Sequence, residues 1–266
     1  MTAGPAPDRR VRDVLRPWLP TVRIAGIDVV DLARRDLVDR AVDAVKRPAP
    51  APTVMFALHV GGLNETADPA FVRVMNAADF VYADGMSVVL LGRLAGARWM
   101  ERTTTTDVGP EILERLAFEL GRPPRVAIVG GPPGLAERAV AVLSGRYGVL
   151  DAGTCDGYRD DYTAPLAAIG EREPDLLVVA MGMPREAEWV RRHRAGITAP
   201  LVLTAGGLLG FLAGDETRAP RLAGRTGLEW VWRLAQRPAL ASRYGHGALT
   251  VARLALRDRR TTGGPP

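Results

Sequence analysis

The sequence predicts an α/β protein built on a doubly wound, mostly parallel sheet, followed by an Arg-rich helical appendage. Two observations support this class. Apolar runs of strand length alternate with segments of helical periodicity, and the strand-like runs end in glycine turns. The clearest are residues 125–129 before Gly130-Gly131, 176–180 before Gly182, and 201–205 before Gly206-Gly207. In such sheets ligands bind beyond the carboxyl ends of the strands, where these turns lie.

The other elements follow along the chain in the same alternation. We expect a strand at 22–30, a helix at 32–46 and, after a proline-rich break at 48–52, a buried strand at 53–58. Further helices are expected at 69–78, 108–120 and 185–194, with a strand at 80–82. The chain therefore divides into a flexible arm at 1–20, an α/β core at 21–215 and a helical basic appendage at 216–266.

Positive charge is concentrated in that appendage. Between Arg218 and Arg260 the chain carries ten arginines against two acidic residues, Glu229 and Asp258. Such a block can meet phosphates, an acidic partner or an anionic membrane surface, which gives the protein a possible peripheral membrane contact. The alternative is a solvated helical face.

Composition excludes several classes of protein. The single cysteine, Cys155, rules out an internal disulfide framework and a multi-cysteine zinc site, and it fits a reducing cytoplasm. No apolar stretch reaches the roughly 18 residues that span a bilayer, and residues 1–16 lack the apolar run of a signal peptide. We therefore expect a cytoplasmic protein, with membrane association through the basic tail and no nucleic-acid partner.

The glycine turns match neither the GxGxxG dinucleotide fingerprint nor a Walker A sequence. The histidines His59, His193 and His246 have no metal-ligand spacing, and no HExxH or Gly-x-Ser-x-Gly motif is present. Dehydrogenase, P-loop, zinc-protease and α/β-hydrolase functions are thus disfavoured.

One carboxylate is placed where chemistry is expected. Asp84 directly follows the strand at 80–82 and precedes Gly85, so it lies at the ligand-binding edge of the predicted sheet. The alternative is an ordinary Asp-Gly turn.

Several segments, taken in order, resemble the WecG/TagA/CpsF glycosyltransferase family. The resemblance runs from about residue 22 to residue 243, and residues 76–89, which contain Asp84, carry its core signature. The other matching segments are Glu101-Arg102, residues 130–134, Gly157-Tyr158, residues 182–186, residues 205–207, Ala213-Gly214, residues 218–220 and residues 227–230.

The resemblance implies a Rossmann-like core that transfers a sugar from a nucleotide diphosphate with inversion and without an obligatory metal or other cofactor. It implies that Asp84 is the general base. It also places the glycine turns and the Gly157-Tyr158 segment near the nucleotide. The implied donor-binding residues are Gly130, Gly131, Gly157, Tyr158, Gly182, Gly206 and Gly207.

Without a metal, backbone N–H groups and arginines must stabilise the departing diphosphate. Our candidates are Arg102, Arg218 and Arg221, and for each of them a surface salt bridge is the alternative.

Three segments depart from the family pattern. The usual Thr-x-Asn after the first core strand is Ala57-Leu58-His59, the usual Gln-Glu pair is Glu186-Ala187, and the Phe-Asp step is Leu209-Gly210. His59 and Glu186 are therefore new titratable groups in the expected pocket. We expect Glu186 to be catalytic together with Asp84, and His59 to bind substrate.

These departures favour a soluble acceptor in natural-product biosynthesis, as in the lincosamide-antibiotic relative in which the thiol ergothioneine displaces the nucleotide, here GDP. A thiol with a pKa near ~8.5 ionises far more easily than a sugar hydroxyl. The alternative is transfer of an N-acetylmannosamine-type sugar from UDP to a polyprenyl-diphosphate-linked glycan for the cell envelope. A catalytically inactive nucleotide-binding protein is a third hypothesis, which the retained Asp84 and Arg218 oppose. We also expect a homo-oligomer.

Overall fold

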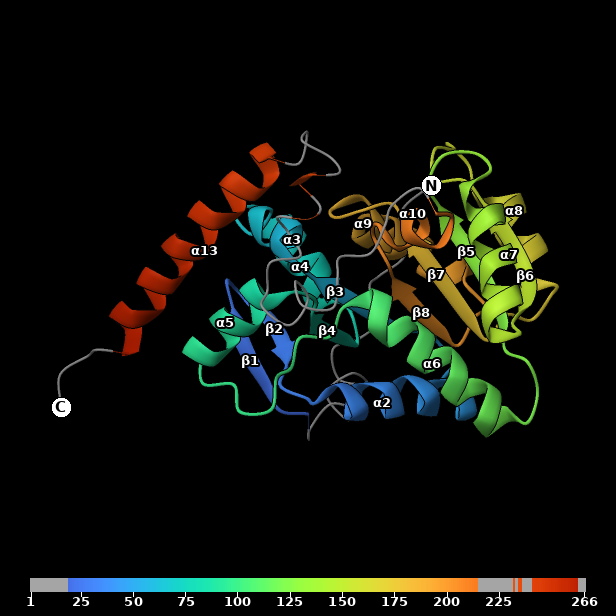
Figure 1. Cartoon of the computed structure of the whole chain (residues 1–266), viewed down its shortest axis with the longest axis horizontal. Helices are drawn as coiled ribbons and strands as arrows, with labels where there is room; N and C mark the ends of the chain where they lie inside the picture. Colours follow the sequence, from blue (N-terminus) through green and yellow to red (C-terminus); the bar gives the residue numbers. More distant parts are fainter. Residues whose placement is uncertain (1–18, 215–231, 233, 236–240, 263–266) are drawn as a thin grey trace.

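A six-stranded parallel sheet forms the centre of the computed structural model, which describes residues 19–214, 232, 234–235 and 241–262 (Figure 1). The inner strands are buried on both faces, which explains their continuous apolar sequences. The spatial order of the strands is β4 (Phe80–Ala83), β3 (Thr53–Leu58), β8 (Leu201–Thr204), β7 (Leu176–Ala180), β5 (Arg125–Gly130) and β6 (Leu150–Cys155).

Helices cover both faces of the sheet, each over its own apolar cluster. One face packs against α3 (Val60–Asn64), α4 (Pro69–Asn76), α5 (Met86–Leu94), α8 (Thr163–Gly170) and α9 (Arg185–His193), which ends in the short 3-10 helix Arg194–Gly196. The other packs against α2 (Arg34–Lys46), α6 (Thr105–Leu120), α7 (Leu135–Tyr147) and α10 (Leu208–Leu212). The predicted Rossmann-like α/β class is confirmed.

The prediction of one strand at 22–30 is wrong. The segment forms an antiparallel hairpin of β1 (Thr21–Ile24) and β2 (Ile27–Val30). The chain reverses at Ala25 and Gly26, which both have positive φ angles of 49° and 86°. Alanine rarely adopts this conformation, so in the sequence only Gly26 indicates a turn.

Helix α13 (Ala241–Thr262) lies against α3 and α5 near the β4 edge of the sheet (Figure 1). A side chain at Gly247 would overlap Val60, so this glycine permits the close approach of α13 to α3. Of the predicted arm, residues 1–18 lie outside the described residues, as does most of the segment between 215 and 240. No described helix is both long and apolar enough to cross a membrane.

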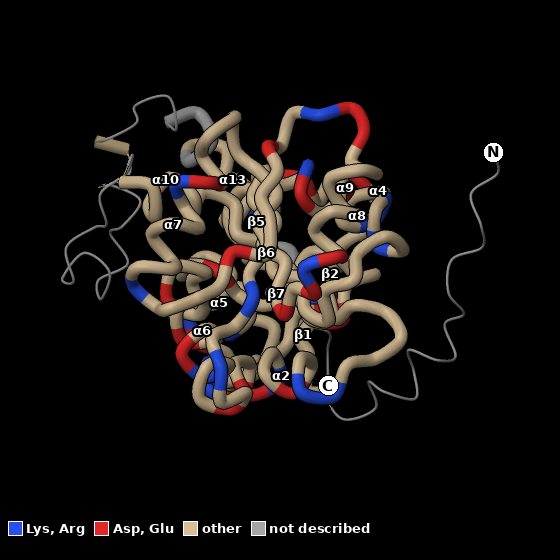
Figure 2. The backbone as a smooth tube through the Cα atoms, turned by 90° about the vertical axis from the view of Figure 1, so that its right-hand side faces the viewer, with Lys and Arg blue, Asp and Glu red and all other residues tan. Residues whose placement is uncertain are grey.

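Charged positions of both signs lie along α2, whereas those of α6 are mostly acidic (Figure 2). The two helices are linked by ion pairs such as Arg115 with Asp39 at 3.2 Å and Lys46 with Glu119. Surface pairs of this kind each contribute about 0–1 kcal/mol. They therefore orient the helices more than they stabilise the fold.

Candidate active site

The carboxyl ends of the six strands bring most of the predicted site residues to one edge of the sheet. Because all strands are parallel, each of these residues follows its strand on the same side. In spatial order they are Asp84 after β4, His59 after β3, Gly206-Gly207 after β8, Gly182 after β7, Gly130-Gly131 at the end of β5 and Gly157-Tyr158 after β6.

Asp84 lies between the end of β4 and the start of α5. Its backbone N–H donates to the carbonyl oxygens of Leu58 and Tyr82 at 2.8 and 3.0 Å, which fixes the carboxylate at the sheet edge. Gly85, at φ 94°, turns the chain directly into α5. The Asp-Gly pair thus makes a turn and also presents a carboxylate at the ligand edge.

Tyr82 lies beneath this carboxylate and stays neutral. Burial raises its pKa well above the ordinary value, and the negative charge of Asp84 raises it further. The Tyr82 hydroxyl and Thr105 Oγ1 are 2.9 Å apart, so β4 is bonded to the first turn of α6. Sequence reasoning missed this buried pair, which supports the strand that carries Asp84.

A surface hollow of about 230 Å³ lies at the other half of the edge. It opens where β5 and β7 lie side by side, since β5 continues into α7 on one face and β7 into α9 on the other. Such a divergence is the usual ligand position in a doubly wound sheet. The hollow is lined by Gly131, Gly157, Tyr158, Ala180, Met181, Gly182, Arg185, Gly206 and Gly207.

Glycine is required at Gly130 because a Cβ there would overlap the carbonyl group of Ala180. The close approach lets the Gly131 N–H donate to Ala180 O at 3.0 Å and the Gly157 N–H donate to Gly131 O at 2.8 Å. These hydrogen bonds join the turns after β5, β6 and β7. The wall of the hollow is therefore mostly backbone, which a ligand can approach closely.

Arg185 brings a positive charge to this hollow, and sequence reasoning did not single it out. It is the first residue of α9, and its guanidinium donates to Gly157 O at 2.8 Å. The guanidinium carbon also lies 4.8 Å from the centre of the Tyr158 ring. Arg185 stands between Gly182 and Glu186 in a segment that the sequence already marked, so position alone could have identified it.

Glu186 is an acid of the site whose pKa is strongly shifted, and its side chain is fully buried. One carboxylate oxygen, Oε2, accepts hydrogen bonds from the N–H groups of Met181, Gly182 and Gly206 at 3.2, 3.0 and 3.1 Å. Burial raises the pKa of Glu186 to about 7, although these three bonds oppose the rise. The carboxyl therefore ties the turn after β7 to the turn after β8.

His59 follows β3, beside β8 in the sheet. Its Nδ1 accepts a hydrogen bond from the Gly61 N–H at 2.9 Å and so caps α3. In the neutral ring the proton is then on Nε2. A Cβ at Gly206 would lie 3.9 Å from His59 Nε2 and 4.0 Å from Glu186 Oε1, so the two side chains flank the same space.

The three predicted arginines have different outcomes. Arg102 precedes α6, and its guanidinium lies 3.7 Å from the carboxylate of Asp107. Arg102 therefore forms the salt bridge that was the alternative to a role in diphosphate binding. Arg218 and Arg221 lie outside the described residues, and their part in binding diphosphate stays a prediction.

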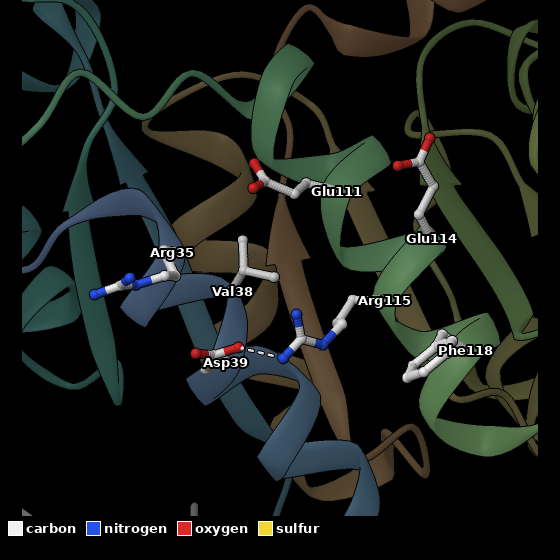
Figure 3. A pocket seen from close by; sticks show the side chains of 7 residues that line it. All are labelled: Arg35, Val38, Asp39, Glu111, Glu114, Arg115 and Phe118. Atoms are coloured by element: carbon white, nitrogen blue, oxygen red, sulfur yellow. Dashed lines mark ion pairs between the residues drawn. The ribbon is translucent and has the colours of Figure 1, made fainter.

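A second surface groove, of about 270 Å³, lies between α2 and α6 (Figure 3). Several of its charged side chains form ion pairs, as Asp39 does with Arg115. Its lining contains no serine, cysteine or histidine side chain that could act as a nucleophile. Among the described residues no group of three His, Cys, Asp or Glu side chains could hold a metal ion.

The strand-end carboxylate, the backbone-lined hollow and the parallel sheet define a Rossmann-like α/β protein with its ligand position at the carboxyl ends of the strands. The family model for the glycosyl transferase WecG/TagA/CpsF family matches residues 22–264. This chain belongs to that family and is a glycosyltransferase.

Two relatives are N-acetylglucosaminyldiphosphoundecaprenol N-acetyl-beta-D-mannosaminyltransferases of Bacillus. The Bacillus subtilis (strain 168) protein is 26% identical over 221 residues, which cover 83% of this chain and 82% of the relative. The Bacillus spizizenii protein is 28% identical over 179 residues, covering 67% and 68% of the two chains.

Proposed function

We propose that this protein transfers an N-acetylmannosamine-type sugar from UDP to N-acetylglucosamine linked to a polyprenyl diphosphate. The observation that carries the proposal is the arrangement of the strand ends, with the glycine hollow at one end and Asp84 at the other. Neighbouring strands are about 4.8 Å apart, so the edge can hold a nucleotide, a sugar and an acceptor side by side. The names of the two Bacillus relatives support this sugar and this acceptor.

In the proposed reaction Asp84 removes the proton from the acceptor hydroxyl. The hydroxyl oxygen attacks the anomeric carbon of the sugar, and the bond from that carbon to the diphosphate breaks. The bonding electron pair leaves with UDP, and the new glycosidic bond forms on the opposite face. A base at the β4 end and a nucleotide at the β5–β7 end fit this in-line geometry and predict inversion.

The diphosphate leaving group gains negative charge during the reaction. The hollow offers backbone N–H groups of its glycine turns and the guanidinium of Arg185. We propose Arg185 as a diphosphate ligand beside the predicted Arg218 and Arg221. The expectation that no metal is obligatory stays a prediction.

The relatives favour a lipid-linked acceptor over the thiol acceptor that the altered sequence positions had favoured. Neither relative's name includes a thiol or an antibiotic pathway. His59 and Glu186 lie near the Gly206 turn, between Asp84 and the hollow. They are thus placed to contact a sugar, and their presence does not indicate the chemical class of the acceptor.

A lipid-linked acceptor requires contact with a membrane surface, and we propose that α5 and α13 provide it. Leu90 on α5 is 52% exposed, and Leu249 and Leu256 on α13 are 58% and 61% exposed. The two helices pack against each other, and Arg253 on α13 is also exposed. Exposed apolar side chains beside basic ones are typical of helices that lie on anionic membranes. Self-association stays a prediction.

The experiment compares acceptors with a single donor. Purified protein receives UDP-N-acetylmannosamine with vesicles that carry undecaprenyl-diphosphate-linked N-acetylglucosamine, or with low-molecular-weight thiols. UDP release and the glycosylated product are both measured. We expect product only with the lipid-linked acceptor. Product only with a thiol would refute the proposed acceptor, and no product with either would refute the proposed donor.

A further inference from the structure

The two oxygens of the Glu186 carboxyl have very different surroundings. Oε2 accepts all three backbone hydrogen bonds, from Met181, Gly182 and Gly206. Oε1 is shielded from solvent and, within the described part of the chain, has no hydrogen-bond partner. An unpaired buried acceptor costs about 1–3 kcal/mol, and such atoms in native proteins usually have a partner that binds there.

Oε1 faces a small space that has a hydrogen-bond donor on its other side. The absent side chain of Gly206 leaves this space open, since a Cβ there would lie 4.0 Å from Oε1 and 3.9 Å from His59 Nε2. The Gly61 N–H donates to His59 Nδ1, so the neutral imidazole carries its proton on Nε2. The space is therefore bounded by an acceptor on one side and a donor on the other.

We propose that Glu186 Oε1, which faces the open space at Gly206, forms a subsite for the donor sugar, and that Glu186 determines sugar specificity. Oε1 accepts a hydrogen bond from a ring hydroxyl or an acylamino N–H of the sugar. This inference rests on the proposed function and names the residue that selects its sugar.

The order of the strands places this subsite correctly for the reaction. His59 and Gly206 follow the central pair β3 and β8, whereas Asp84 follows β4 and the nucleotide hollow extends to β5 and β6. A sugar held at the Gly206 turn thus lies between the base and the diphosphate. The anomeric carbon must occupy this position in an in-line displacement.

The replacement Glu186→Gln tests the subsite without removing the backbone anchor. An amide NH₂ group accepts no hydrogen bond, so the Gln oxygen must take the three N–H bonds of Oε2. The NH₂ group then takes the place of Oε1, and an acceptor becomes a donor.

The measurement is calorimetric binding of UDP, UDP-N-acetylmannosamine and UDP-N-acetylglucosamine to wild type and variants. We expect Glu186→Gln to weaken the preferred UDP-sugar about tenfold or more and to leave UDP affinity within about twofold. The matched control is Glu188→Gln, because Glu188 lies on the same helix but pairs with Arg191 and Arg192 on the surface. It should bind all three ligands like the wild type.

Two results would overturn the subsite alone: unchanged affinity of Glu186→Gln for the UDP-sugar, or an equal loss of its affinity for UDP and UDP-sugar. The second result would mean that Glu186 only holds the two turns in place. A wild-type protein that binds no UDP-sugar would overturn the proposed function together with the subsite. Thermal unfolding of each variant checks that it is folded.

Discussion

The buried carboxyl of Glu186 predicts an unusual dependence of stability on pH. Its pKa rises from the ordinary value of 4.5 to about 7 because burial disfavours the charged form. Between these two values the folded protein binds more protons at this site than the unfolded chain does. The free energy of unfolding therefore falls as pH rises from 4.5 to 7 and levels off above 7.

The difference between the two pKa values corresponds to about 3 kcal/mol, an order-of-magnitude figure. The variant Glu186→Gln cannot ionise, so it should lose none of this stability. Urea unfolding followed by circular dichroism at pH 5, 6, 7 and 8 measures both proteins. Relative to the wild type, we expect the variant to gain about 3 kcal/mol between pH 5 and pH 8.

The surrounding acids do not obscure this window. Glu188, on the same helix, has its pKa lowered to about 2 by Arg191 and, less strongly, by Arg192. Its titration therefore changes the free energy of unfolding only below pH 4.5. Subtracting the variant from the wild type also removes every titration that the two proteins share. A difference that stays constant within about 0.5 kcal/mol across the four pH values would refute the assigned burial of the carboxyl.

Two further variants test the hollow. Gly130→Ala should destabilise the protein by about 3 kcal/mol or more, because the new methyl group overlaps the Ala180 carbonyl. The control Gly145→Ala, on the open face of α7, should be neutral or stabilising by up to about 1 kcal/mol. Urea unfolding measures the stability of both variants. Arg185→Ala should weaken UDP binding about tenfold by calorimetry, whereas Arg192→Ala, on the exposed face of the same helix, should not. Equal effects of the two members of either pair would contradict the structure.

The sequence predicted the buried strands most accurately. The strands at 53–58 and 176–180 were predicted to the residue, because strands buried on both faces read as short, uninterrupted apolar runs. Strand β6 was missed because it is the edge strand, with Asp151 and Thr154 interrupting its apolar residues. Helices α3, α5, α8 and α10 were missed as well, and α3 and α10 are only five residues long.

The position of Asp84 and the glycine turns followed from the sequence, because every parallel strand ends at the same edge of the sheet. The anchoring of Glu186 could not be predicted in the same way. Its three partners are backbone N–H groups of turns after two different strands, so the contact depends on the pairing of β7 with β8. No single sequence segment carries that information.

The most direct test of Asp84 as the general base is the turnover of Asp84→Asn. With UDP-N-acetylmannosamine and the lipid-linked acceptor, we expect at least a 100-fold loss of kcat and a UDP affinity within about twofold of the wild type. Asp43→Asn, on the exposed side of α2, is the matched control and should turn over normally. Near-normal turnover of Asp84→Asn would contradict the assignment of Asp84 as the base.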